Sequence, residues 1–297
     1  MPKSGFVTFV GRPNAGKSTL LNALMGKKIA ITSDTAQTTR HRFRAIMTGD
    51  DYQIILVDTP GLHKSKDALG DELNISALKG IEDVDVVCML IDCTSPIGKG
   101  DAWVAEKVSS VDAKKICILS KCDLANEETV FAQRHAAENL LAWDAMVALS
   151  SVSGKNLDAL VEELIYFLPE GPFWFPKDME TDQPIEVIIA EFIREKILRF
   201  YSEEIPHAIG VKLDGLEYNK SKKLYSVYAT IYVEHESQKG IIIGREGKAL
   251  KQVGCAARID LERLLDAKVY LDLNVKLKKN WRKDATQIRR FGYGEGV

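Results

Sequence analysis

A glycine-rich segment near the N-terminus carries residues whose types and spacing suit phosphate binding. Residues 11–18 read GRPNAGKS and match the pattern G-x-x-x-x-G-K-[ST], directly after a strand-like run and before a helical one. In this context backbone N–H groups and the helix N-terminus hold phosphates, Lys17 reaches the β and γ oxygens, and Ser18 offers its hydroxyl to Mg²⁺. The segment predicts a nucleoside triphosphate site formed by Asn14, Ala15, Gly16, Lys17, Ser18 and Thr19.

A second chemical signal is the Asp-Thr-Pro-Gly run at residues 58–61, which ends a hydrophobic stretch. A carboxylate placed there lies at the carboxyl edge of a parallel sheet, so Asp58 is near enough to bind a metal ion through water. Gly61 can then turn its N–H towards a γ-phosphate. An isolated Asp-x-x-Gly is more often a plain turn, but its position after a phosphate loop indicates a metal and γ-phosphate site.

Two later segments have the pattern that distinguishes guanine from adenine. Residues 120–123 (SKCD) resemble the motif Asn/Thr-Lys-x-Asp, in which the Asp123 carboxylate accepts from guanine N1–H and the exocyclic amine while Lys121 lies along the base. Adenine has no such donors, so the site is expected to reject ATP. Ser120 replaces the usual Asn and shortens the side chain that ties this loop to the phosphate loop. That exchange predicts weaker guanine nucleotide binding without a change of base choice.

Residues 150–154 (SSVSG) resemble the remaining guanine motif, Ser-Ala-x, with Ser151 in place of the alanine. In that motif the contact to guanine O6 comes from backbone N–H groups, so the exchange is expected to matter little. Ser150, Ser151 and Val152 complete the predicted nucleotide site.

In the C-terminal part the residue pattern indicates RNA binding. Residues 241–250 (IIIGREGKAL) resemble the KH signature, in which two glycines let the backbone between two helices approach the phosphates of a single strand, beside a groove for about four nucleotides. The alternative is a simple helix–helix turn. The predicted RNA contacts in this loop are Gly244, Arg245, Glu246, Gly247 and Lys248.

A basic run follows near the C-terminus. Residues 276–290 contain seven Lys and Arg side chains against one acid, and Trp281 lies among them as a surface on which a base could stack. Two alternatives stay open: the run is a solvated face, or Trp281 docks this tail on the preceding sheet. The predicted RNA contacts here are Lys278, Lys279, Trp281, Arg282 and Lys283.

The elements that must position the nucleotide site can be predicted from the same sequence. Strand-like runs at residues 6–10, 54–58, 84–92, 115–121 and 146–150 alternate with helical stretches. This alternation predicts an α/β fold with a mostly parallel sheet and helices on both faces. Residues 42–48 join the run at 54–58 through so short a turn that these two strands must pair antiparallel, so the sheet is mixed.

A cluster of prolines divides the chain. Residues 168–184 include Pro169, Pro172, Pro176 and Pro184, which interrupt any helix and predict a short, semi-rigid connector. We therefore expect a nucleotide-binding domain over residues 1–168, a linker over 169–184 and an RNA-binding domain over 185–297. The last region shows the order helix-strand-strand-helix-helix-strand, which is that of an α+β, bacterial-type (type II) KH domain.

The two parts differ in charge although the whole chain has a net charge of only −2. Residues 1–184 carry 19 Lys and Arg against 26 Asp and Glu, whereas residues 185–297 carry 21 against 16. A polyanion is therefore expected to meet the C-terminal part, with its net charge of +5. The longest apolar runs are far shorter than the roughly 18 residues that cross a bilayer. We expect a soluble, cytosolic protein.

Five cysteines, at positions 88, 93, 117, 122 and 255, are an odd number in a large chain, which does not suggest a disulfide framework. The pairs 88/93 and 117/122 invite a metal-site interpretation. That interpretation is disfavoured because Cys88 and Cys117 lie in strand-like runs, where a buried thiol behaves as a small hydrophobe.

Taken in order, these motifs make residues 1–168 resemble a translation-factor-type small GTPase domain. The run at residues 37–42 (QTTRHR), followed by DTPGLH at 58–63 and then a KH signature, resembles the Era family of GTPases. The resemblance implies hydrolysis of GTP by attack of water on the γ-phosphoryl group, slow without help, with Lys17, Thr39, Gly61 and Asn14 in catalytic positions. It implies Mg²⁺ bound by Ser18, Thr39 and Asp58, although Thr38 is close enough to compete with Thr39.

The residue after Asp-x-x-Gly is Leu62, where Ras-like enzymes have a glutamine that orients the attacking water. In related GTPases with this substitution, an asparagine at the position of Asn14 helps bind a K⁺ ion. Asn14 could equally stabilise the loop, and the sequence leaves both interpretations open.

The resemblance also implies a biological role. Era-family proteins are bacterial or organellar GTPases that bind the 3′ end of small-subunit (16S-type) ribosomal RNA and assist small ribosomal subunit maturation, with loose membrane association reported. We expect a cytoplasmic monomer with these partners. One alternative is a tRNA-modification GTPase, which predicts an extra domain and a C-terminal catalytic cysteine that are absent from this sequence. The other is an RNA-binding module that senses GTP without useful hydrolysis.

Overall fold

The computed structural model describes residues 1–33, 38–41, 43–58, 60, 67–291 and 293. The chain forms two compact units, which are described separately. One comprises residues 1–66 and 70–182, and the other comprises residues 67–69 and 183–297.

A six-stranded sheet forms the centre of the first unit, in the order β2-β3-β1-β4-β5-β6. All neighbouring strands pair parallel except β2 and β3, which pair antiparallel, so the predicted mixed sheet is confirmed. The strands are β1 (Lys3–Gly11), β2 (Phe43–Thr48), β3 (Tyr52–Asp58), β4 (Val86–Asp92), β5 (Lys114–Ser120) and β6 (Ala145–Ala148).

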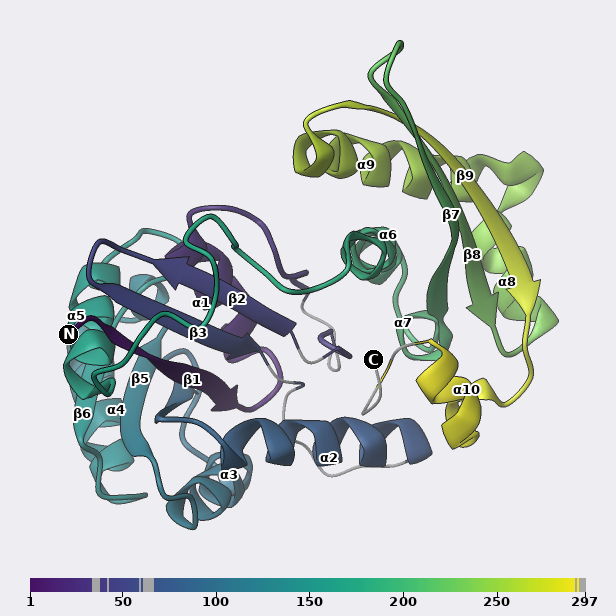
Figure 1. The fold of residues 1–297 in the computed structure, drawn as a ribbon. Coiled ribbons are helices and arrows are strands. Elements are labelled where there is room, and N and C mark those ends of the chain that lie inside the picture. Colours follow the sequence, from purple (N-terminus) through teal and green to yellow (C-terminus); the bar gives the residue numbers. More distant parts are fainter. Residues whose placement is uncertain (34–37, 42, 59, 61–66, 292, 294–297) are drawn as a thin grey trace. The chain divides into compact units, whose positions relative to one another are not determined.

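Helices lie on both faces of this sheet (Figure 1), as the alternating pattern predicts. On one face α1 and α5 contact β1 and β3; elsewhere α3 contacts β1 and β4, and α4 contacts β5. Because helices cover both faces of the central strands, these strands are apolar throughout instead of alternating apolar and polar residues. Residues 86–91 of β4 are all 0 % exposed. The helices are α1 (Lys17–Met25), α2 (Ala68–Glu82), α3 (Lys99–Ser109), α4 (Glu127–Glu138) and α5 (Leu157–Phe167).

The parallel register brings the ends of four strands, β1, β3, β4 and β5, to one edge of the sheet. Phe9 of β1 lies opposite Asp58 of β3, and Asp92 of β4 lies opposite Ser120 of β5. The phosphate loop, the predicted metal ligand Asp58 and the predicted base-reading segment (residues 120–123) therefore all lie at the carboxyl edge, where α/β sheets bind ligands.

The proline-rich segment after α5 packs on the first unit. The backbone N–H of Ser4 donates to the carbonyl of Pro169, and that of Ile46 donates to Glu180 (3.1 and 2.8 Å). Between these points the buried Gln53 side chain donates to the carbonyl of Phe175 and accepts from two backbone N–H groups. The two units divide after Asp182, so most of the predicted linker over 169–184 is attached to the sheet.

The second unit has a three-stranded sheet in the order β7-β8-β9. β7 (Gly210–Asn219) and β8 (Leu224–Val233) pair antiparallel, whereas β8 and β9 (Lys268–Leu277) pair parallel. The predicted order of elements is present, with additional short helices. The helices are α6 (Ile185–Phe200), α7 (Ile205–Ala208), α8 (Glu236–Ile243), α9 (Lys248–Leu265) and α10 (Ala285–Arg290), with short 3-10 turns η2 (Arg245–Gly247) and η3 (Trp281–Lys283). The first unit also has a 3-10 turn, η1 (Cys122–Leu124), after β5.

Among the described residues, no helix is both long enough and apolar enough to span a membrane.

Candidate nucleotide site and RNA groove

The phosphate loop runs from the end of β1 to the first turn of α1. Gly16 has φ 97°, a left-handed backbone conformation that L side chains rarely adopt, and it directly precedes the helix. This turn leaves the free N–H groups of the α1 N-terminus open to an anion. Inside the loop, Lys17 Nζ donates to the carbonyls of Gly11 (3.1 Å) and Arg12 (3.0 Å).

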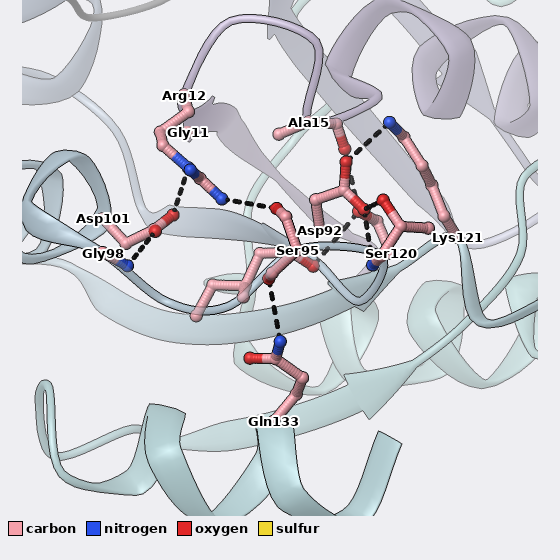
Figure 2. Close-up of polar contacts among 12 residues, drawn as sticks. Gly11, Arg12, Ala15, Asp92, Ser95, Gly98, Asp101, Ser120, Lys121 and Gln133 are labelled. Atoms are coloured by element: carbon pink, nitrogen blue, oxygen red, sulfur yellow. Dashed lines mark hydrogen bonds and ion pairs between the residues drawn. The ribbon is translucent and has the colours of Figure 1, made fainter. Parts of the chain in front are cut away.

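Side chains that the sequence analysis did not identify hold this loop through hydrogen bonds and an ion pair. Figure 2 shows Arg12 reaching Asp101 at the start of α3 (Nε–Oδ1 2.8 Å) and Ser95 (Nη2–Oγ 3.0 Å). Asp101 is 1 % exposed and also accepts from the Gly98 N–H, while Gln133 of α4 donates to the Ser95 carbonyl. These contacts connect the phosphate loop to α3 and α4, two of the helices that pack on the sheet.

Three oxygen atoms converge beside the first turn of α1. Ser18 Oγ lies 3.1 Å from Thr39 Oγ1 and 2.9 Å from Asp58 Oδ2, and Thr39 Oγ1 lies 3.3 Å from the same carboxylate oxygen. Thr38 instead donates from Oγ1 to the Ser33 carbonyl (3.4 Å). We call Ser18, Thr39 and Asp58 the oxygen cluster; the structure brings all three predicted metal residues together and sets Thr38 apart.

The oxygen cluster fits Mg²⁺. Hydroxyl and carboxylate oxygens are the hard donors that Mg²⁺ takes. The second carboxylate oxygen, Asp58 Oδ1, is buried and receives no hydrogen bond from the described residues, so it is available to a metal-bound water. Burial raises the pKa of Asp58, while Lys17 and the hydroxyls of Ser18 and Thr39 lower it, and a divalent cation would further favour the charged carboxylate.

Lys17 is also titratable near neutral pH. Burial lowers its pKa to about 8, and the opposing attraction of Asp58 does not restore the ordinary value of 10.5. Bound phosphates add negative charge around Nζ, which raises this pKa again.

Nucleotide binding above pH 8 should therefore take up a proton on Lys17. We expect GDP affinity to fall as pH rises through about 8, by at most about tenfold per pH unit. Calorimetric titration at pH 8 in two buffers of different ionisation enthalpy should show uptake of about half a proton per GDP. Binding without proton uptake would mean that Lys17 stays charged in the free protein.

The base-reading segment begins where β5 ends. Lys121 has φ 58°, and its Nζ contacts Asp92 Oδ2 at 2.7 Å. Burial alone would raise the pKa of Asp92, but hydrogen bonds from Lys121 and Thr94 bring it below its usual value. Asp123 follows with an exposed side chain, so its carboxylate is open to a base.

The last guanine motif lies beside this segment. The Cys122 N–H donates to the carbonyl of Leu149, which joins the two loops. Ser150 is fully buried and its Oγ accepts from the Ser153 N–H (3.1 Å), so it shapes the turn, while Val152 is exposed at the surface. The structure thus places the loops that carry the two guanine motifs side by side at the sheet edge.

Ser120 makes the connection that its short side chain was expected to lose. Its Oγ lies 2.8 Å from the carbonyl of Ala15 in the phosphate loop and 3.2 Å from that of Ile91, and the residue is 2 % exposed (Figure 2). The predicted weakening was wrong in its premise, because β5 approaches the phosphate loop closely enough for a hydroxyl to bridge the two.

Replacing Ser120 with Ala should weaken GDP and GTP equally. Loss of one such hydrogen bond is expected to cost about 1 kcal/mol, or about fivefold in Kd. Ser120→Asn should give no gain, since a larger side chain must enter a filled site. Titration with a fluorescent guanine nucleotide measures both variants, and tighter binding by Ser120→Asn would show that the hydroxyl bridge is a poor substitute.

Gly61 and its neighbour Leu62 lie outside the described residues. Asn14 is exposed at the tip of the phosphate loop with φ 64°. Ala15 and Thr19 occupy the loop and the first turn of α1, as expected.

In the second unit, the Gly-x-x-Gly segment joins α8 to α9. Gly244 has φ 69°, and a Cβ there would lie 2.5 Å from the Ala249 Cβ, so only glycine fits. Arg245 and Glu246 are exposed between the two glycines, and Lys248 Nζ pairs with Glu246 Oε2 at 2.9 Å. The loop presents backbone and charged side chains together.

A groove of about 700 Å³ extends from this loop between α9 and β9. The side chains from α9 recur every three or four residues, which places one helix face along the groove. This face includes residues that the sequence analysis missed, and the helical spacing after Gly247 is the signal that could have found them. The groove is lined by Gly247, Leu250, Lys251, Gly254, Arg258, Tyr270 and Leu273, among others.

The basic tail is in part structural. Trp281, predicted to stack on a base, is 0 % exposed and donates from Nε1 to the Ala208 carbonyl (3.0 Å), so the stacking prediction is wrong. The tail does dock through Trp281, as the alternative had it, but the hydrogen bond is to α7 rather than to the sheet. Arg282 donates to Glu234 (2.8 Å), and Lys278 lies over the ring of Tyr232. Lys279 and Lys283 remain exposed.

Comparison with known families matches this division. Residues 6–121 match the family described as 50S ribosome-binding GTPase, and residues 204–282 match the KH domain family. The chain is a P-loop GTPase followed by a KH domain.

Two solved structures are similar over the full length. The structure of Aquifex aeolicus Era bound to GDP and AlF4⁻ is 35 % identical, with 99 % of this chain and 100 % of that chain covered and a TM-score of 0.95. A structure of Era with MgGDPNP and nucleotides 1506–1542 of 16S ribosomal RNA gives the same identity and coverage with a TM-score of 0.96. The protein described here belongs to the Era family of GTPases.

Proposed function

We propose that this protein hydrolyses GTP, binds the 3′ end of small-subunit ribosomal RNA through its KH domain, and assists maturation of the small ribosomal subunit. The observation that carries the proposal is the full-length similarity to an Era structure that holds both MgGDPNP and a 16S ribosomal RNA fragment. The groove beside the Gly-x-x-Gly loop supplies a place for the RNA in this chain.

The geometry supports a role for each residue of the nucleotide site. Lys17 and the N–H groups at the start of α1 hold the β and γ phosphates, and Ser18, Thr39 and Asp58 would hold Mg²⁺, which neutralises charge on those phosphates. Lys121, Asp123 and the loop at residues 150–152 hold the guanine. Catalysis consists mainly of positioning and charge neutralisation, so unaided hydrolysis is slow.

The proposal is tested with the full-length protein and a 3′-terminal fragment of small-subunit ribosomal RNA. Filter binding should show preference for this fragment over an equally long scrambled RNA, and single-turnover hydrolysis of GTP should be measurable with and without it. Binding without hydrolysis under either condition would favour a GTP-sensing RNA module. RNA crosslinked in cells and dominated by messenger RNA would remove the ribosomal assignment.

Asn14 at the tip of the phosphate loop is the proposed ligand of a K⁺ ion. Asn14 is exposed within the phosphate loop, and the Leu62 side chain has no group that could hydrogen-bond to water and orient it. A monovalent cation there would offset charge on the phosphates as they separate.

If Asn14 helps to hold K⁺, GTP hydrolysis should be faster in KCl than in NaCl at equal ionic strength. Asn14→Ala should abolish that difference while leaving the slow rate in NaCl nearly unchanged. Single-turnover assays in the two salts measure both effects. Equal rates for the parent protein in KCl and NaCl would contradict the K⁺ site.

A ribosomal RNA partner is consistent with a cytoplasmic monomer, and the family resemblance adds loose association with the inner membrane. Size-exclusion chromatography and cell fractionation test these expectations.

A further inference from the structure

Two cysteine thiols lie side by side at the base-reading segment. Cys93 follows the last residue of β4, and Cys122 stands between Lys121 and Asp123 after β5. Because β4 and β5 are parallel neighbours with Asp92 opposite Ser120, the two strand ends bring the sulfur atoms to 3.7 Å. Cys93 is 1 % exposed and Cys122 is half-buried, so an oxidant can reach the second thiol but not the first.

The two thiols differ in acidity. A hydrogen bond from Cys93 lowers the pKa of Cys122, and the Leu149 backbone and Lys155 act in the same direction, against the opposing effects of burial and of Asp123. The same hydrogen bond, together with burial, raises the pKa of Cys93. Cys122 is therefore the better nucleophile, and Cys93 keeps its proton beside it.

We propose that Cys93 and Cys122 form an oxidisable pair, which hydroperoxides convert to a disulfide that weakens guanine nucleotide binding. The proposed loss of nucleotide binding rests on the assignment of Lys121 and Asp123 as base-reading residues. Formation of the disulfide rests only on the position of the two thiols.

The chemistry balances with peroxide as the oxidant. The Cys122 thiolate attacks one peroxide oxygen, the O–O bond breaks, and hydroxide leaves and takes up a proton, which gives a sulfenic acid on Cys122 and one water. The Cys93 sulfur then attacks the Cys122 sulfur, the S–O bond breaks, and the Cys93 proton leaves with the hydroxide as a second water. Two thiols and one hydrogen peroxide thus give one disulfide and two waters.

The bond would change the base-reading segment because of where Cys122 stands. A disulfide of about 2.05 Å requires the two sulfurs to approach by about 1.7 Å from their present separation. Cys122 begins η1, directly after the left-handed Lys121, so this movement acts on the two side chains that hold guanine. Lys121 is also paired with Asp92, the neighbour of Cys93, so both ends of the new bond border the same ion pair.

Linkage gives the proposal a second consequence. If the disulfide weakens GDP binding tenfold, then saturating GDP must favour the dithiol tenfold, which raises the reduction potential of the pair by about 30 mV. Bound nucleotide would therefore protect the pair from oxidation, and nucleotide-free protein would be the sensitive form.

The other cysteines provide controls. Cys88 and Cys117 are 0 % exposed within the strands, and burial raises the pKa of both thiols. Cys255 is exposed in the second unit and could react on its own. Cys255→Ser in the full-length protein is therefore the matched background for all measurements.

The test treats nucleotide-free Cys255→Ser protein with hydrogen peroxide. Mass spectrometry of a non-reduced digest should show a crosslink between the peptides that contain Cys93 and Cys122, absent in Cys93→Ala and in Cys122→Ser. Affinity for a fluorescent GDP should fall at least tenfold after oxidation and return with dithiothreitol. Neither single variant should show this reversible loss.

A glutathione redox series with and without GDP completes the test. The midpoint should move to a higher potential with GDP, by an amount that matches the measured loss of affinity. A crosslink to Cys117, or no crosslink at all, would overturn the thiol pair. A Cys93–Cys122 crosslink with unchanged GDP affinity would refute its effect on the nucleotide, and a separate base-selectivity measurement then shows whether the base-reading assignment also fails.

Discussion

Asp123→Asn should shift the preference of the nucleotide site from guanine to xanthine. Asp123 is exposed next to Lys121, and in the proposed site its carboxylate would accept from two guanine donors, whereas an amide can donate to the 2-oxo group of xanthine. Loss of two charge-assisted hydrogen bonds should weaken GTP binding by about 100-fold or more, since such bonds are worth about 1.5–3 kcal/mol each. Competition between XTP and GTP for the same labelled nucleotide measures the shift.

Glu127→Gln is the matched control for that experiment. It makes the same change of charge on an exposed side chain at the start of α4 and should leave the preference for GTP unaltered. Continued preference for GTP in Asp123→Asn would show that Asp123 does not bind the base.

Changing Arg245 and Glu246 together to Asp should remove most RNA binding while GTP hydrolysis persists. The variant loop would carry two carboxylates and no guanidinium where the phosphate backbone is expected to pass, and neither glycine of the loop is altered. For the parent protein, filter binding at several salt concentrations should show affinity falling by about 0.7 log units per decade of salt for each phosphate neutralised. The double variant should bind too weakly to define that slope.

Lys220→Asp, in the exposed turn between β7 and β8, changes the net charge of the protein by the same amount and serves as the control. It should bind RNA nearly as the parent does. If the double variant also bound RNA like the parent, the KH loop would be excluded and the exposed Lys279 and Lys283 would remain as the candidate contacts.

The nucleotide motifs could be predicted from the sequence because phosphate chemistry restricts residue type at fixed positions. The turn before α1 requires a left-handed backbone, which glycine adopts readily at position 16. A lysine in the first turn of α1, at position 17, is placed to reach the phosphates. The pairing direction of β2 and β3 could be predicted for a different reason: a turn too short to cross over forces these two strands to pair antiparallel.

Contacts between distant segments could not be predicted in this way. Ser120 reaches Ala15 across 105 positions of the sequence, and whether a hydroxyl suffices depends on how closely two backbones approach. Trp281 lies in a run of basic residues, which suggests an exposed position. Its ring instead packs edge-on against Phe291, with the ring centroids 4.8 Å apart, and its N–H donates to a carbonyl of α7. The local sequence shows which residues are neighbours along the chain, but not which residues are neighbours in the folded structure.

The attachment of residues 169–182 to the first unit determines where this protein can be divided. β2 is an edge strand, and residues 180 and 181 bond to its outer side, which would otherwise offer unpaired backbone groups to another molecule. A fragment that ends at residue 168 would expose that edge and deprive the buried Gln53 of its hydrogen bonds to residues 174 and 175, which favours self-association. A fragment that ends at Asp182 keeps the edge covered, so the segment protects the GTPase domain from aggregation as well as connecting it to the next.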